Sequence, residues 1–162
     1  MDNYNDFEKD ELLALANLYF DRQDYIVSLR ILKRLVSEET APVGAFSTLG
    51  RIYAVLGLFE RAMVAFETYL EFRPEAIPER FEMSLIHRHM ENDDKALKIW
   101  EEILKDNANF APVLYAKAMY LRDNELEDEA IDLLTQLIEN TPAEDRHVEL
   151  ANQLLSEISL YC

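Results

Sequence analysis

Apolar residues recur along the chain three or four positions apart, which is the spacing of one face of an α-helix. The pattern is clear in two stretches, one formed by Leu12, Leu15, Leu18 and Tyr19 and the other by Phe59, Met63 and Phe66. Three glycines and five prolines are few for 162 residues, which disfavours a turn-rich all-β fold. The pattern therefore predicts an all-α protein.

The helical pattern repeats every 34 residues, and no gap is needed between Lys9 and Glu144. Two columns of small residues recur at this interval: column A with Ala16, Gly50, Ser84 and Ala118, and column B with Ser28, Ala62, Ala96 and Ala130. Four positions after column B comes a large apolar residue, in turn Leu32, Phe66, Trp100 and Leu134. Small residues let two helices approach closely, and the large residue one turn later fills the adjacent groove. The columns therefore predict pairs of packed helices.

The second repeat carries a recognisable signature. Its residues match W-x2-L-G-x2-Y…A-x3-F…P with one aromatic residue exchanged, through Phe46, Leu49, Gly50, Tyr53, Ala62, Phe66 and Pro74. The chain therefore resembles the tetratricopeptide repeat family over residues 9 to 144. The other repeats match more loosely, with Thr40 in place of the proline in the first and with Arg80, His87 and Lys117 as departures in the third and fourth.

The resemblance implies a right-handed α-solenoid of four helix pairs, at residues 9–42, 43–76, 77–110 and 111–144. Prolines stand where the first turn of a helix tolerates them, at Pro42, Pro78 and Pro112. The run Thr141-Pro142-Ala143-Glu144 has the form of a capping box. It predicts that a helix starts near residue 142 and forms the C-terminal cap, residues 145–162. Residues 1–8 form a short polar segment, and we expect a single domain.

The net charge of the chain limits the classes of partner that it can bind. It holds 32 acidic and 16 basic residues, for a net charge of −16, and the fourth repeat alone has eight acids against two bases. Such a surface repels nucleic acid and anionic lipid. The single cysteine is Cys162, the N-terminus lacks the basic start of a signal peptide, and no apolar run is long enough for a membrane span. We expect a cytoplasmic protein with no nucleic-acid partner and no membrane insertion.

Catalytic and metal-binding motifs are not found. The sequence has no nucleophile elbow, phosphate loop, dinucleotide fingerprint or zinc-protease helix. His87 and His89 point to different faces of a helix, so they cannot share one metal ion. The acidic run from Asp123 to Glu129 lacks the glycine of a calcium loop and instead suits the solvated start of a helix. We expect no enzyme activity, no metal and no cofactor.

The family resemblance implies a concave groove lined by the first helix of each repeat. The residues it assigns to this inner wall, after the packing columns are removed, are Leu13, Asn17, Phe20, Ser47, Thr48, Arg51, Phe81, Glu82, Leu85, Arg88, His89, Tyr115, Met119 and Arg122. Aromatic residues and arginines are favoured where proteins bind one another. A carboxylate clamp for chaperone C-termini is not expected, because Asn17 matches one clamp position while Leu13, Thr48, Pro78 and Glu82 stand at the others.

These observations favour a non-enzymatic adaptor that binds a peptide or helix segment of another protein, with arginines fixing acidic or backbone groups. Two alternatives stay open: a small acidic chaperone of a secretion or assembly system, and a self-associating scaffold. The apolar residues of the last helix span about 160° at 100° per residue. This arc is wider than one packed face needs, so Leu150, Leu154 and Tyr161 are candidates for contact with a second copy or a partner.

Overall fold

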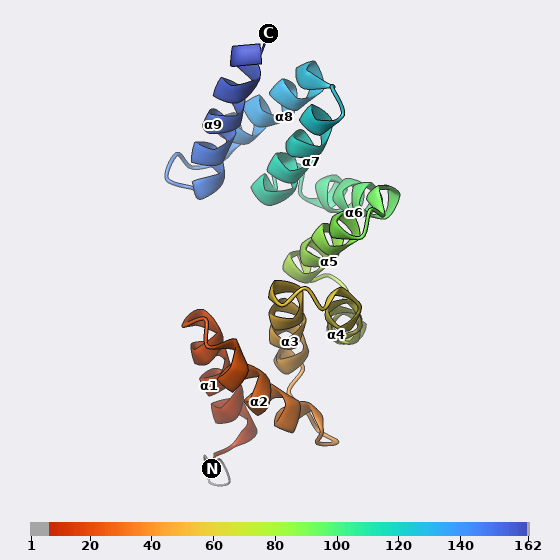
Figure 1. Cartoon of the computed structure of the whole chain (residues 1–162), viewed down its shortest axis with the longest axis vertical. Helices are drawn as coiled ribbons and strands as arrows, with labels where there is room; N and C mark the ends of the chain where they lie inside the picture. Colours follow the sequence, from red (N-terminus) through yellow and green to blue (C-terminus); the bar gives the residue numbers. More distant parts are fainter. Residues whose placement is uncertain (1–6, 162) are drawn as a thin grey trace. The chain divides into compact units, whose positions relative to one another are not determined.

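The computed structural model describes residues 7–161, with side chains as far as Ser159. The described residues form nine helices and no strand (Figure 1). The helices are α1 (Lys9–Asp21), α2 (Tyr25–Val36), α3 (Gly44–Val55), α4 (Phe59–Phe72), α5 (Ile77–His89), α6 (Asp93–Asp106), α7 (Ala111–Asp123), α8 (Glu127–Asn140) and α9 (Arg146–Tyr161). The predicted all-α fold is confirmed, with two helices in each predicted repeat.

The helices are grouped in two compact units, one up to Met90 and one from Glu91. In the first unit, α1 packs against α2 and α3 against α4, while α5 packs on α4 and more lightly on α3. In the second unit, α7 packs against α8, and α9 packs on both of them. The boundary falls between the two helices of the third repeat. The expectation of a single domain stays a prediction.

Columns A and B are buried throughout, and so are the large residues that follow column B. In the first repeat, the hydroxyl of Ser28 donates a hydrogen bond of 2.8 Å to the carbonyl oxygen of Ala16. In the second repeat, a Cβ atom added to Gly50 would lie 2.6 Å from Cε1 of Phe66. The columns therefore mark the line of closest approach between the paired helices of these two repeats.

The turns inside the repeats share a backbone conformation that the sequence did not reveal. Among the described residues, those with positive φ are Gln23, Gly57, Glu91 and Glu125, again 34 positions apart, with φ between 59° and 70°. In three of these turns the residue after the positive-φ position donates its backbone N–H to the carbonyl oxygen five residues earlier in the preceding helix. An example is the hydrogen bond of 2.8 Å from Leu58 N–H to the carbonyl oxygen of Tyr53. This is the Schellman ending of a helix, for which glycine is the usual residue. The chain has glycine at only one of the four positions.

The start of the last helix differs from the prediction. Thr141 has an extended backbone at the end of α8, and the amide of Asp145 donates to the carbonyl oxygen of Pro142, which forms a turn instead of a helix. The prediction of a capping box at residues 141–144 is therefore wrong, and α9 begins at Arg146. Asp145 caps it, because its carboxylate accepts a hydrogen bond of 2.8 Å from the amide of His147. This bond and a second one from the His147 ring hold the pKa of Asp145 below its ordinary value.

The other predicted helix starts hold in part. Pro78 and Pro112 lie in the first turns of α5 and α7, whereas Pro42 precedes α3 by two residues. The acidic residues from Glu127 occupy the first turn of α8, where they complement the positive end of the helix dipole.

We expect Gly50→Ala to destabilise the protein by about 1 to 3 kcal/mol, because the new methyl group would overlap the Phe66 ring. Alanine normally favours a helix over glycine, so a loss of stability would report the close approach itself. Gly44→Ala is the control, since its methyl would meet only the end of the flexible Leu13 side chain, at 3.2 Å. Chemical denaturation measures both changes. A Gly50→Ala protein as stable as the parent would contradict the packing.

Substitutions at the positive-φ residues should shift stability in opposite directions. Glu125→Gly should raise the free energy of unfolding by up to about 1 kcal/mol, because an L side chain is strained in the left-handed region. Gly57→Ala should lower it by about 1 kcal/mol. Thermal unfolding of both variants tests the pair of expectations, and a change of the same sign in both would show that the turns do not hold this conformation.

Candidate functional site

The inner-wall residues predicted for the first two repeats lie together in the first unit. The hydroxyl of Thr48 on α3 donates a hydrogen bond of 2.7 Å to Oδ1 of Asn17 on α1. One turn further along, the guanidinium carbon of Arg51 lies 5.6 Å from the centroid of the Phe20 ring, within the range of a cation–π contact. The first helices of neighbouring repeats are thus joined by the residues that the resemblance assigns to the groove.

Similar contacts join α3 to α5. The hydroxyl of Ser47 donates a hydrogen bond of 2.6 Å to Oε1 of Glu79. Glu82, one turn further along α5, interacts electrostatically with Arg51. Burial raises the pKa of Glu82 above its ordinary value, and the Glu79 carboxylate adds to this rise, although the charge of Arg51 acts against it. Perturbed carboxylates occur both at functional sites and in structural ion-pair networks, so Glu82 is a candidate site residue.

A cavity of about 380 Å³ lies on this face, and we call it the α1–α3 cavity. It is lined by Asn17, Phe20, Asp21, Gly44, Ser47, Thr48, Arg51 and Tyr69. The sequence identified Asn17, Phe20, Ser47, Thr48 and Arg51 as inner-wall residues. It missed Tyr69, because Tyr69 belongs to α4, a second helix of a repeat, to which the resemblance assigns no part of the groove.

Leu13 was also predicted for the wall, and this assignment stays a prediction. Its side chain is half-buried and packs against the hydrophobic core of the first unit. The position of a Cβ atom built on Gly44 would be 3.2 Å from Cδ2 of Leu13. Leu13 therefore supports the start of α3, beside the cavity.

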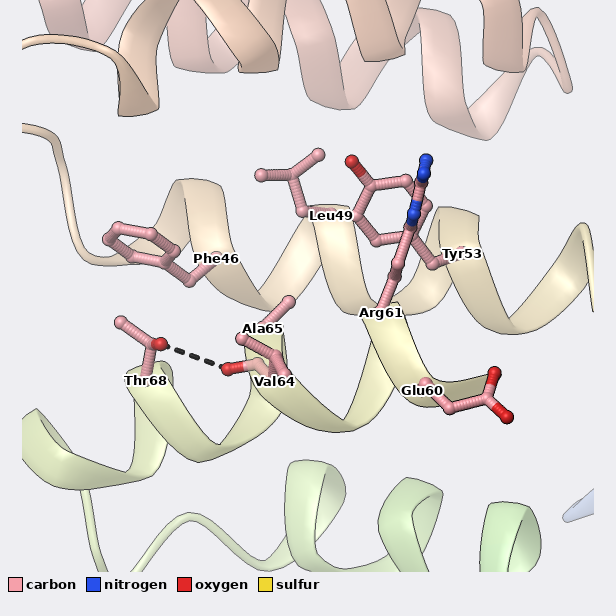
Figure 2. A pocket seen from close by; sticks show the side chains of 8 residues that line it. All are labelled: Phe46, Leu49, Tyr53, Glu60, Arg61, Val64, Ala65 and Thr68. Carbon is pink, nitrogen blue, oxygen red and sulfur yellow. Dashed lines mark hydrogen bonds between the residues drawn. The ribbon is translucent and has the colours of Figure 1, made fainter. Parts of the chain in front are cut away.

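A second cavity, of about 420 Å³, lies between α3 and α4, and we call it the α3–α4 cavity (Figure 2). It is lined by Phe46, Leu49, Tyr53, Glu60, Arg61, Val64, Ala65 and Thr68. At 100° per residue, its lining residues on α3 are on the side of that helix opposite to Ser47 and Arg51. Arg61 extends alongside Tyr53, with its guanidinium carbon 6.0 Å from the ring centroid. The sequence missed this cavity because its aromatic residues match the packing positions of the repeat.

The predicted residues of the third repeat are on α5 in the first unit. Phe81, Leu85 and Arg88 are each half-buried, and none of them lines either of the two cavities. The neighbouring His89 stacks on the ring of Phe59, with centroids 5.2 Å apart. The role of Phe81, Leu85 and Arg88 in a groove stays a prediction.

The predicted residues of the fourth repeat contact the terminal helix. The ring of Tyr115 meets that of His147 edge-on at 6.4 Å, and Met119 packs against the core that α7, α8 and α9 share. Arg122 pairs with Asp123 at 2.8 Å and with Glu157 on α9 at 3.3 Å. Of the residues predicted for the wall in the fourth repeat, Tyr115 and Arg122 therefore contact residues of α9.

The terminal helix uses its apolar stripe for packing. Leu154 is 3% exposed and lies in the core of the second unit with Val148, Ala151 and Ile158. The prediction that Leu154 offers surface to a partner is therefore wrong, because α9 turns this residue inward against α7 and α8. Leu150 is half-buried. The side chain of Tyr161 lies outside the described part of the chain.

Other kinds of site were searched for among the described residues. They contain no cluster of three or more histidine, cysteine or acidic side chains placed to hold a metal ion. Nor does any described helix combine the length and apolarity needed to cross a membrane.

Comparison with known proteins identifies the fold. No protein-family model and no curated protein matches the chain by sequence. Among solved structures, the crystal structure of MamA matches with a TM-score of 0.71 and 20% identity, over 82% of this chain and 77% of that one. A tetratricopeptide repeat protein from Parabacteroides merdae ATCC 43184 matches with a TM-score of 0.72 and 17% identity, over 93% and 60%. MamA 41-end from Desulfovibrio magneticus RS-1 matches with a TM-score of 0.70 and 16% identity, over 93% of each chain.

The chain has the tetratricopeptide repeat fold, as the repeat signature predicted. Its nine described helices fit four repeats followed by a capping helix.

The raised pKa of Glu82 gives the protein a distinctive dependence of stability on pH. A carboxyl group whose pKa is higher in the folded chain stabilises the fold while protonated, and this contribution is lost as the pH rises through the folded-state pKa. Glu82→Gln should therefore raise the free energy of unfolding, relative to the parent, at pH 7 but not at pH 3.5.

Urea denaturation at the two pH values measures this effect. Glu67→Gln on α4 is the control, since it removes one charge at an exposed position of the same unit. An equal gain for Glu82→Gln at both pH values would contradict the assignment of a buried, destabilised carboxylate.

Proposed function

We propose that the chain is a non-enzymatic adaptor that holds a segment of another protein in the groove of the first unit, on the face formed by α1, α3 and α5. The observation that carries this proposal is the α1–α3 cavity. Asn17, Phe20 and Arg51, which the resemblance assigns to the inner wall, line the cavity together, and each has a partner in the neighbouring repeat. A cavity built from cross-repeat contacts is preorganised, which lowers the entropic cost of binding.

The distribution of exposed apolar side chains also supports the first unit as the place where the partner binds. Most of the exposed large apolar side chains belong to it, whereas among the described residues of the second unit Leu126 is the single example. Tyr115 and Arg122, which the resemblance assigns to the wall of the second unit, are already in contact with α9, and Met119 packs against the core of that unit. A partner's apolar side chains therefore find more surface to bury in the first unit, at about 1.5 to 3 kcal/mol for each large side chain fully buried.

The distribution of charge follows the same division. The first unit holds 15 of the 32 acidic and 10 of the 16 basic residues, so the second unit carries the larger share of the net negative charge. High net charge keeps a protein soluble. We assign to the second unit the role of closing the repeat array and keeping it in solution.

A self-associating scaffold is the second candidate, and the α3–α4 cavity favours it. The wall of that cavity is mainly apolar and includes Val64, whose side chain is 62% exposed. A chaperone of a secretion or assembly system is the third. A chaperone would use the same groove as the adaptor. The size and acidity of the chain fit both functions and therefore do not distinguish between them.

Filling each cavity in turn tests the proposal. Ser47→Trp places a large ring in the α1–α3 cavity, and Thr68→Trp places one in the α3–α4 cavity. We expect Ser47→Trp to lower the amount of partner captured from the native cell by at least about tenfold, because the ring occupies the volume that the partner needs. Thr68→Trp should capture as much partner as the parent.

Circular dichroism is used to check that both variants keep their helices, and mass spectrometry is used to quantify the captured protein. Loss of capture with Thr68→Trp alone would move the site to the α3–α4 cavity. Loss of self-association in the same variant, measured by light scattering, would support the scaffold instead.

A further inference from the structure

The face of the first unit that bears the α1–α3 cavity holds more negative than positive charge. Asp21 and Arg51 line the cavity itself. Glu79 is attached to this face by its hydrogen bond from Ser47, and Glu82 interacts with Arg51. With Arg88, which the resemblance assigns to the same wall, three carboxylates stand against two guanidinium groups.

The charge of Arg51 is already used within the fold. Its guanidinium group lies over the Phe20 ring, and it counters the carboxylate of Glu82. Burial and the nearby Glu79 carboxylate raise the pKa of Glu82, against the lowering effect of Arg51. An acidic side chain entering this face would add a further like charge, whereas a basic one would relieve the excess.

The lining of the cavity also suits a long basic side chain. The rings of Phe20 and Tyr69 offer apolar surface for the methylene stem of lysine or arginine. The face of an aromatic ring attracts a cation as well. Asp21 lines the cavity and is exposed, so the charged head can meet a carboxylate that is still in contact with water. Asp21 is also the last residue of α1, where a negative charge opposes the helix dipole, so helix stability does not explain its presence.

We propose that the partner segment held in the groove is basic, and that a lysine or arginine side chain of this segment enters the α1–α3 cavity with its cationic head at Asp21, on the face to which Glu82 contributes a further negative charge. This inference rests on the proposed function and adds the chemistry of the partner to it. It differs from the expectation that the groove arginines fix acidic groups of the partner, because Arg51 lies over the Phe20 ring and interacts with Glu82, and Arg122 pairs with Glu157 of the chain itself.

Peptide selection tests the proposal without knowledge of the natural partner. The probe is a phage-displayed library of random 12-residue peptides, selected against the full chain. We expect the selected peptides to be enriched in lysine and arginine. Selection against the double variant Asp21→Asn/Glu82→Gln should lose this enrichment.

The control removes the same two kinds of charge elsewhere. Glu127→Gln/Asp128→Asn neutralises two carboxylates in the first turn of α8, in the second unit. It should select the same basic peptides as the parent. Equal loss of enrichment in both double variants would show general attraction to an acidic protein and would overturn the proposal, as would enrichment of acidic or uncharged peptides.

Affinity measurements separate this proposal from the proposed function. For one selected peptide, fluorescence anisotropy should show binding about threefold to tenfold weaker to the Asp21→Asn/Glu82→Gln variant. Replacing the peptide's basic residue by glutamine should weaken binding to the parent by a similar factor but have little further effect on that variant. If the peptide binds Ser47→Trp as tightly as the parent, the groove is not the site and the proposed function itself fails. If Ser47→Trp abolishes binding while the charge variants do not alter it, the groove stands and the basic partner is rejected.

Discussion

The close approach of two helices within a repeat is the constraint on which the rest of the structure depends. In the second repeat there is no room for even one methyl group between Gly50 and the Phe66 ring. In the first repeat the hydroxyl of Ser28 reaches the backbone of Ala16 directly. Because these pairs fix how the helices of each repeat pack, they also fix which side chains of α1 and α3 project away from the pair. Apart from Tyr69 on α4, the α1–α3 cavity is built from those projecting residues.

The repeat period made the fold predictable from sequence. Columns A and B and the large residues four positions after column B are buried as expected, because packing in a repeat fold depends on residue size at fixed positions. The turns were less accessible to such an argument. Gln23, Glu91 and Glu125 share the backbone conformation of Gly57, yet their identities give no sign of it, because the conformation is imposed by the helices on either side.

The site could be predicted only in part. The resemblance identified residues of the α1–α3 cavity on the first helices, such as Asn17 and Arg51, but not Tyr69, which reaches the cavity from α4. The width of the apolar arc of the last helix led to the wrong prediction that Leu154 contacts a partner. A helix packed against two others buries a wider face than a helix packed against one. Periodicity shows which residues are apolar, whereas the number of neighbouring helices decides how many of them are covered.

The central claim is that a partner protein lies in the α1–α3 cavity of the first unit. Photo-crosslinking in the native cell tests it most directly, with p-benzoylphenylalanine in place of one tyrosine at a time. Tyr69 lines the α1–α3 cavity, Tyr53 lines the α3–α4 cavity, and Tyr115 contacts α9 in the second unit. The account predicts a crosslinked partner from position 69 and none from positions 53 or 115. Crosslinks from position 53 or 115 without any from position 69 would contradict it.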